Sequence, residues 1–181
     1  LQRLTSKVLL FVRSEKLQPQ HFDLAGFYPY YHEKPEYARA LQVLQDKGRL
    51  LVLGRPAGGK SRMAYQLAKA CPGHWVMCLP SNFNDWEKID FPHFPFFHPM
   101  RVLWFVDDLD KYIGGASLDW GERAMGQQCR LRLIGTCRSG DELSQVRSDK
   151  ALGAFVESLS TVECSDFSDE ELLDLAHKTG K

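Results

Sequence analysis

The chain has 181 residues, a length that fits one ordinary domain with a substantial core. Its hydrophobic content is 44%, its charged content is 25%, and 23 basic residues balance 23 acidic ones. This composition is typical of a soluble globular protein, and the zero net charge gives no overall attraction to nucleic acid or to an anionic membrane. The longest apolar runs are too short to span a bilayer. The five cysteines form no closely spaced framework, which favours reduced thiols and a cytoplasmic location.

The N-terminal segment has its own pattern. Residues 1–18 carry apolar side chains at roughly helical spacing, and Pro19 then interrupts the pattern. We therefore expect a helical linker at 1–20 and the domain itself at 21–181. The sequence starts without Met and stops just after an expected helix, so we expect a domain excised from a longer protein.

Helices and strands alternate along the rest of the chain. The expected strands are 50–53, 74–79, 101–106, 130–135 and 160–164. The expected helices are 35–45, closed by Gly48, then 60–70, 118–128 and 140–150, and a last one whose N-terminal capping box begins at Ser168. This alternation predicts a mostly parallel five-stranded sheet covered by helices on both faces, a three-layer α/β/α sandwich.

The most informative motif lies between the first expected strand and the next helix. Residues 54–61 read Gly-Arg-Pro-Ala-Gly-Gly-Lys-Ser, a complete GxxxxGK[ST] phosphate-binding loop. Glycines let backbone N–H groups close around phosphates, and the helix N-terminus adds a positive dipole end. Lys60 can reach the β- and γ-phosphates, and the Ser61 hydroxyl can bind Mg²⁺. The predicted nucleotide-binding residues are Gly54, Arg55, Pro56, Ala57, Gly58, Gly59, Lys60, Ser61 and Arg62.

An acidic pair follows the apolar strand 101–106. In a parallel sheet this strand delivers its terminal carboxylates to the edge where ligands bind. We expect Asp107 to complete an Mg²⁺ site with Ser61, and Asp108 to orient or deprotonate an attacking water. The alternative is a strand that ends in a solvated acidic turn.

The next strand ends in polar and cationic groups at the same edge of the sheet. The Thr136 hydroxyl can position water, and the Arg138 guanidinium can bind γ-phosphate oxygens in a bidentate way. Such a contact exists with a triphosphate and weakens with a diphosphate. The alternative for Arg138 is a surface arginine at a strand end.

The three motifs GRPAGGKS, VLWFVDDLD and LIGTCRS, in this order, resemble the STAND branch of the AAA+-related P-loop ATPases, which includes the NB-ARC and NACHT families. The resemblance covers about residues 25–178, and the acidic segment from Asp166 to Leu175 is similar to the family's approach to a helical lid. It implies a P-loop NTPase fold with an ASCE/AAA+-like core, ATP or ADP with Mg²⁺, and slow hydrolysis. It also implies a signalling or defence switch: ADP holds a closed form, and ATP favours an open, self-associating form. The lid, the effector domain and the sensor domain would lie outside this chain.

Some positions depart from the family pattern. The segment ahead of the first core strand has no Arg after its Gly, although Phe27 and Tyr28 can stack on adenine, with core packing as the alternative. The Phe- and Pro-rich cluster 91–99 is expected to be a hydrophobic plug, or else a partner surface. Two other functions stay open from the residues: a small-molecule or nucleoside kinase, and a nucleotide-binding scaffold without turnover. The paired acids and the lack of an arginine-rich lid favour hydrolysis over the kinase.

Overall fold

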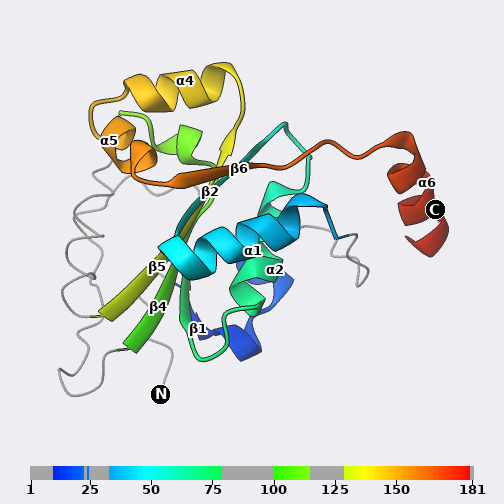
Figure 1. Ribbon diagram of the computed structural model, residues 1–181, viewed down its shortest axis with the longest axis horizontal. Helices are drawn as coiled ribbons and strands as arrows, with labels where there is room; N and C mark the ends of the chain where they lie inside the picture. The colour runs from blue at the N-terminus through cyan, green and yellow to red at the C-terminus, as the bar shows by residue number, and fades with distance from the viewer. Residues whose placement is uncertain (1–9, 23, 25–32, 79–99, 115–128, 180–181) are drawn as a thin grey trace.

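The computed structural model describes residues 10–22, 24, 33–78, 100–114 and 129–179. The expected helix at 118–128, the cluster 91–99, and Phe27 and Tyr28 lie outside these ranges. Within them, six strands form one sheet in the order β1-β3-β4-β5-β2-β6 (Figure 1). The strands are β1 Leu10–Arg13, β2 Arg49–Gly54, β3 Trp75–Cys78, β4 Met100–Val106, β5 Cys129–Arg138 and β6 Ser160–Glu163.

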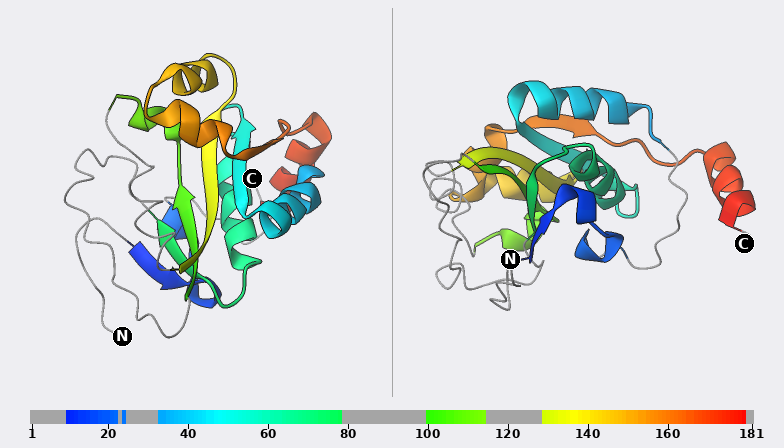
Figure 2. Two further views of the ribbon diagram at one scale, coloured as in Figure 1. Left: turned by 60° about the vertical axis from the view of Figure 1, so that its left-hand side comes forward. Right: turned by 90° about the horizontal axis from the view of Figure 1, so that it is seen from below.

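Helices cover both faces of this sheet, as Figures 1 and 2 show. The helices are α1 Glu36–Lys47, α2 Lys60–Lys69, α4 Asp141–Ser148, α5 Leu152–Glu157 and α6 Asp169–Thr179. The 3₁₀ turns are η1 Ser14–Lys16, η2 Pro19–Phe22 and η4 Leu109–Tyr112. The α/β/α sandwich with a mostly parallel sheet is therefore confirmed.

The core explains why the central strands read as continuous apolar runs. Along β2 the side chains alternate: Leu50 and Val52 pack with α1 and α2, whereas Leu51 and Leu53 pack with α4 and α5. Strand β4 alternates in the same way, with Trp104 fully buried on the α4–α5 side. A parallel strand buried on both faces needs apolar residues at every position, so its sequence shows no polar alternation.

The helix expected over 1–18 is wrong for the described part of that segment. Residues 10–13 form β1, which adds antiparallel to β3 and raises the strand number to six. The Phe11 ring stacks on Trp75 with centroids 4.8 Å apart, and Val12 packs on the opposite face of the sheet. The alternation of faces at 11 and 12 is a strand period, and pairing with the free edge of β3 outweighs the weak helical spacing. The boundary at residue 20 stays a prediction, although β1 is part of the sheet.

Helix α5 was not expected from the sequence. Asp149 ends α4 and accepts hydrogen bonds from the backbone N–H groups of Ala151 and Leu152, at 2.8 and 2.9 Å, which starts α5. A Cβ on Gly153 would lie 2.5 Å from the carbonyl oxygen of Arg147. Glycine therefore permits the close approach of the two short helices, a contact that sequence spacing does not reveal.

The final helix begins as predicted. The backbone N–H of Ser168 donates to the Glu171 carboxylate at 2.7 Å, and the N–H of Glu171 donates to Ser168 Oγ at 3.2 Å. This reciprocal pair is the expected capping box. Helix α6 then projects from the side of the sheet (Figures 1 and 2). Among the described residues, no helix has the length and apolar character needed to cross a bilayer.

Candidate nucleotide-binding site

The phosphate loop is shaped mainly by its backbone. Strand β2 delivers Gly54 to the carboxyl edge of the sheet, and α2 begins six residues later at Lys60. Between them, Ala57 and Gly59 adopt left-handed conformations, with φ of 60° and 89°, and the N–H of Gly58 donates to the Arg55 carbonyl at 3.1 Å. A Cβ on Gly58 would lie 3.1 Å from the same carbonyl oxygen, so glycine fits this close turn best. The loop is thus folded into a compact cradle at a helix N-terminus.

Lys60 lies inside this cradle. Its side chain is almost fully buried, and its ammonium donates to the carbonyl oxygen of Arg55 at 2.8 Å. An ammonium in this position can turn to phosphate oxygens by exchanging one hydrogen bond, since a lysine head has three donors on a flexible stem.

Ser61 joins the loop to the acidic strand. Its hydroxyl lies 3.0 Å from Oδ1 and 3.2 Å from Oδ2 of Asp107, a residue 46 positions away at the end of β4. Burial raises the pKa of Asp107 above its ordinary value, and the negative charge of Asp108 adds to this effect. Hydrogen bonds from Thr136 and Ser61 oppose it. A desolvated carboxylate beside a hydroxyl supplies the hard oxygen ligands that Mg²⁺ prefers, so Ser61 and Asp107 fit this ion.

Thr136, near the end of β5, is fully buried and contacts both Asp107 and Asp108. Its hydroxyl donates to Asp107 Oδ1 and accepts the backbone N–H of Asp108 at 2.9 Å. The bond to Asp107 uses the single donor of the hydroxyl, so Thr136 orders the Asp107 carboxylate and the backbone of Asp108 in this structure. Direct contact with a water stays a prediction.

Asp108 has an unusual conformation. Its φ and ψ are 49° and 65°, in the left-handed region where a residue with a Cβ is uncommon. Its carboxylate lies 2.7 Å from the ammonium of Lys111, one turn along η4. This contact raises the pKa of Lys111. Backbone strain of this kind often accompanies functional sites, and here the fixed partners on each side of Asp108 maintain it.

Arg138 lies opposite Gly54 in the parallel pair of β5 and β2. Its guanidinium contacts two carboxylates: Nε is 3.9 Å from Asp110 Oδ2, and Nη1 is 3.6 Å from Glu142 Oε1. The arginine is therefore next to the start of the phosphate loop, and acidic side chains already engage it.

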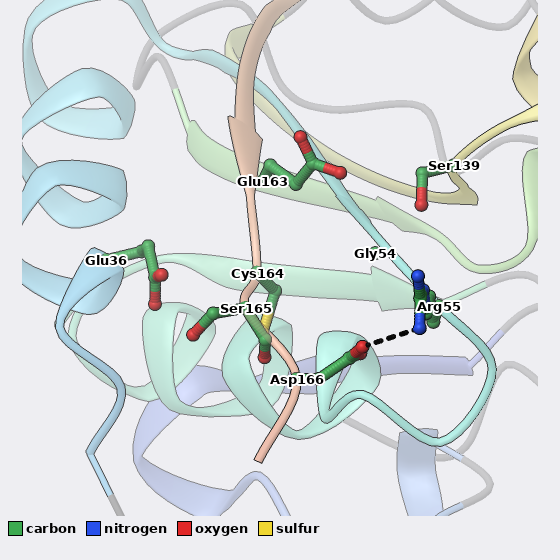
Figure 3. Close-up of a pocket in the computed structure, with 8 residues that line it drawn as sticks. All are labelled: Glu36, Gly54, Arg55, Ser139, Glu163, Cys164, Ser165 and Asp166. Carbon is green, nitrogen blue, oxygen red and sulfur yellow. Dashed lines mark hydrogen bonds and ion pairs between the residues drawn. The ribbon is translucent and has the colours of Figure 1, made fainter. Parts of the chain in front are cut away.

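The segment after β6 packs along the loop. The thiol of Cys164 donates to the carbonyl of Gly58 at 3.1 Å, and the carboxylate of Asp166 lies 3.3 Å from the guanidinium of Arg55. A cavity of about 380 Å³ opens here, and Figure 3 shows its lining. The lining residues are Glu36, Gly54, Arg55, Ser139, Glu163, Cys164, Ser165 and Asp166.

Lys34 also contacts the segment that follows β6. It is 3% exposed, and its ammonium donates to the Ser165 carbonyl at 3.0 Å. The same ammonium lies 3.5 Å from the centroid of the Phe167 ring and 3.8 Å from the Glu171 carboxylate. The residues just before α1 are thus linked to the start of α6, close to the phosphate loop.

The comparisons with known proteins now decide the family. Residues 31–171 match the model of the family described as Novel STAND NTPase 3. The chain belongs to this family. The resemblance predicted from the three motifs is therefore confirmed at the level of a STAND NTPase domain, and none of the curated proteins matches this STAND chain.

Two solved structures of Hsp104, an AAA+ ATPase, have a similar fold. A closed-state structure of Hsp104 with ATPγS and FITC-casein has a TM-score of 0.63 and 16% identity. An extended-conformation complex of S. cerevisiae Hsp104 with casein has a TM-score of 0.65 and 14% identity. Each comparison covers 96% of this chain and 32% of the Hsp104 chain, so the STAND domain spans about a third of those chains. At these identities the similarity establishes the fold alone.

Most of the predicted site residues meet at one edge of the sheet. Hydrogen bonds join Ser61, Asp107, Asp108 and Thr136 into one group. Lys60 precedes Ser61 at the start of α2, and Arg138 ends the neighbouring strand β5. The Arg62 guanidinium instead lies over the ring of Tyr65, 5.9 Å from its centroid.

The partners of these residues were not expected from the sequence. Two of them had a visible signal, since Lys111 and Glu142 are only three and four positions from the residues that they contact. Lys34 and the segment 164–166 had none, because their contacts join distant parts of the chain.

Proposed function

We propose that this STAND domain binds ATP and ADP with Mg²⁺ at the phosphate loop, hydrolyses ATP slowly, and acts as a nucleotide-controlled switch. One observation carries the proposal: the loop hydroxyl of Ser61 and the strand-end carboxylate of Asp107 lie 3.0 Å apart, beside the buried Lys60. Family membership and the AAA+ fold support the same conclusion.

Each residue has a role that follows from its chemistry. The loop N–H groups and the Lys60 ammonium bind the β- and γ-phosphates, and Ser61 and Asp107 hold Mg²⁺. When bound, the ion neutralises charge on the phosphate oxygens. Asp108 accepts a proton from the attacking water, and Arg138 binds the γ-phosphate. The Lys111 ammonium, 2.7 Å from the Asp108 carboxylate, competes with the attacking water for this carboxylate, which is consistent with slow turnover.

The sugar and base fit the cavity beside the loop. Three carboxylates line it, from Glu36, Glu163 and Asp166. Carboxylates accept hydrogen bonds from ribose hydroxyls, whereas they would repel phosphates. We therefore place the phosphates on the Lys60 side of the loop and the nucleoside in the cavity.

Switching would depend on the segment after β6. It touches the phosphate loop at Cys164 and Asp166, and it leads directly into the projecting helix α6. A change in the loop on nucleotide exchange can therefore alter the position of α6. We propose that this change controls self-association and the activity of an effector domain in a cytoplasmic signalling or defence protein.

Calorimetric titration with ATP and ADP, each with and without Mg²⁺, tests the proposed site. We expect micromolar binding, about −8 kcal/mol, that strengthens with Mg²⁺. In Lys60→Ala the ammonium is lost, and triphosphate affinity should fall at least about 100-fold, since a charge-assisted phosphate contact disappears.

Lys69→Ala is the matched control. Lys69 lies on the same helix and is exposed, so the Lys69→Ala protein should bind nucleotide normally. If Lys60→Ala bound ATP as tightly as Lys69→Ala, the phosphate-loop assignment would be wrong.

A further inference from the structure

We propose that Asp110, assisted by Glu142, determines how strongly the site prefers a diphosphate to a triphosphate. It does so by competing with the γ-phosphate for Arg138. This inference rests on the proposed function and adds a specificity-determining residue to it.

The position of Asp110 supports this role. It is the third acid of the segment 107–110 and lies on η4, directly after the acids of the metal and catalytic sites. Its side chain is 12% exposed, and its carboxylate contacts the Arg138 guanidinium at 3.9 Å through Oδ2. The other oxygen, Oδ1, is buried and finds no hydrogen-bond donor among the described residues. In the part of the chain that the structure describes, Arg138 is the cation in ion-pair contact with this carboxylate, so the carboxylate depends on it.

Arg138 lies where it can contact either the acidic side chains of Asp110 and Glu142 or a γ-phosphate. It is opposite Gly54 in the strand register, and its next residue, Ser139, donates a backbone hydrogen bond to the Gly54 carbonyl at 3.3 Å. Its side chain is 39% exposed, so it can rotate. A γ-phosphate beside the loop offers it a dianionic, bidentate partner, whereas a diphosphate leaves it with Asp110 and Glu142.

The two partners have unequal effects on nucleotide affinity. Moving Arg138 to a γ-phosphate takes from the largely buried Asp110 its ion pair with Arg138, and this cost is subtracted from triphosphate binding alone. ADP binding does not require the move. The ion pair at 3.9 Å is loose, so the cost is modest and a triphosphate can still overcome it. Asp110 therefore shifts the balance of the switch toward the diphosphate form.

The test compares dissociation constants for ADP and for AMP-PNP, a non-hydrolysable triphosphate, in the presence of Mg²⁺. In Asp110→Asn we expect AMP-PNP to bind between about threefold and tenfold tighter relative to ADP. Glu142→Gln, whose pair is more exposed, should give about a twofold change in the same direction. Asp141→Asn removes the same charge from an exposed neighbour of Glu142 on α4 and should leave the ratio unchanged.

A double variant identifies the mechanism. In an Arg138→Ala background, Asp110→Asn should no longer change the AMP-PNP to ADP ratio, because the competing group is absent. A purely structural role for Asp110 would alter thermal stability in both backgrounds without changing this ratio. If Asp110→Asn did not fold, the effect of Glu142→Gln on the ratio would still decide.

The inference is overturned if Asp110→Asn and Glu142→Gln leave the ratio unchanged, or if they weaken AMP-PNP binding. The second result would mean that the acids orient Arg138 toward the phosphate. Either result leaves the proposed function standing as long as Lys60→Ala lowers triphosphate affinity at least about 100-fold. Normal binding by Lys60→Ala would instead remove the proposed function itself.

Discussion

The two halves of the candidate site are built by different means. The phosphate-loop half, residues 54–61, is fixed by backbone conformation, by a turn bond from Gly58 to Arg55, and by the buried Lys60. The charged half, at the ends of β4 and β5, is fixed by side chains that pair with one another. Lys111 contacts Asp108, and Asp110 contacts Arg138.

Because of this difference, we expect the phosphate-loop half to bind the nucleotide and the charged half to respond to the γ-phosphate. A loop held by its own backbone has little to reorganise when phosphates arrive, so we expect it to supply affinity for ATP and ADP alike. Side chains that already have partners must exchange them when a ligand binds. For Arg138, only a ligand with a γ-phosphate offers a new anionic partner. A ligand shifts an equilibrium only through its differential affinity for the two states. In the proposed switch, the charged half is therefore where the two nucleotides are distinguished.

The largest expected effect comes from removing the central carboxylate of the charged half. Asp108→Ala should keep nucleotide binding but lower the rate of phosphate release about 100-fold or more, because no group then accepts the proton of the attacking water. Single-turnover assays measure the rate, and calorimetry measures the binding. Lys111→Met is the informative partner variant: it frees the Asp108 carboxylate, so hydrolysis should not fall. An Asp108→Ala protein that released phosphate at the normal rate would require another base.

The phosphate loop could be predicted from the sequence almost completely. Its glycines, Lys60 and Ser61 occur at fixed spacing between an apolar strand and a helix, and backbone geometry depends on that local order. The strands were predictable for a related reason: a parallel strand buried on both faces is a short apolar run. The capping box at Ser168 and the helix end at Gly48 are equally local.

The partners of the charged half could not be predicted in the same way. That Asp110 contacts Arg138 depends on how the turn after β4 packs beside β5, a tertiary arrangement with no sequence period. The same is true of Lys34 and Ser165, which are 131 positions apart. At the N-terminus, helical spacing was misleading, because the free edge of β3 offered hydrogen bonds that an isolated segment lacks.

A smaller effect is expected at Asp107, which joins the two halves through its hydrogen bond with Ser61. Burial raises the pKa of Asp107, so the folded chain binds this proton more tightly than the unfolded chain does. The contribution of Asp107 to the free energy of unfolding is therefore greatest at pH values below the ordinary pKa of an aspartate. This contribution declines as the pH rises through the raised pKa of Asp107. Without nucleotide and Mg²⁺, Asp107→Asn should raise the free energy of unfolding by about 1 kcal/mol at neutral pH, as relief of a functional strain often does.

Urea unfolding between pH 4 and pH 8 measures this effect. The gain in Asp107→Asn should shrink toward pH 4, and Mg²⁺ should no longer strengthen ATP binding to the variant. Asp46→Asn, an exposed acid on α1, serves as the control and should change neither property. A variant less stable than the parent at neutral pH would show that the hydrogen bonds from Ser61 and Thr136 outweigh the buried charge.

The smallest effect should come from the one described ion pair on the loop itself. Arg55 and Asp166 lie 3.3 Å apart, but their side chains are 77% and 51% exposed, so water and salt screen the attraction. We expect Asp166→Asn to lower the free energy of unfolding by no more than about 0.5 kcal/mol. Gly58→Ala on the same loop places a Cβ 3.1 Å from a backbone carbonyl and should cost more, with a clear loss of ATP affinity. If Asp166→Asn weakened both properties as much as Gly58→Ala, the loop would depend on its side-chain contact, and the contrast between a backbone-built half and a side-chain-built half would fail.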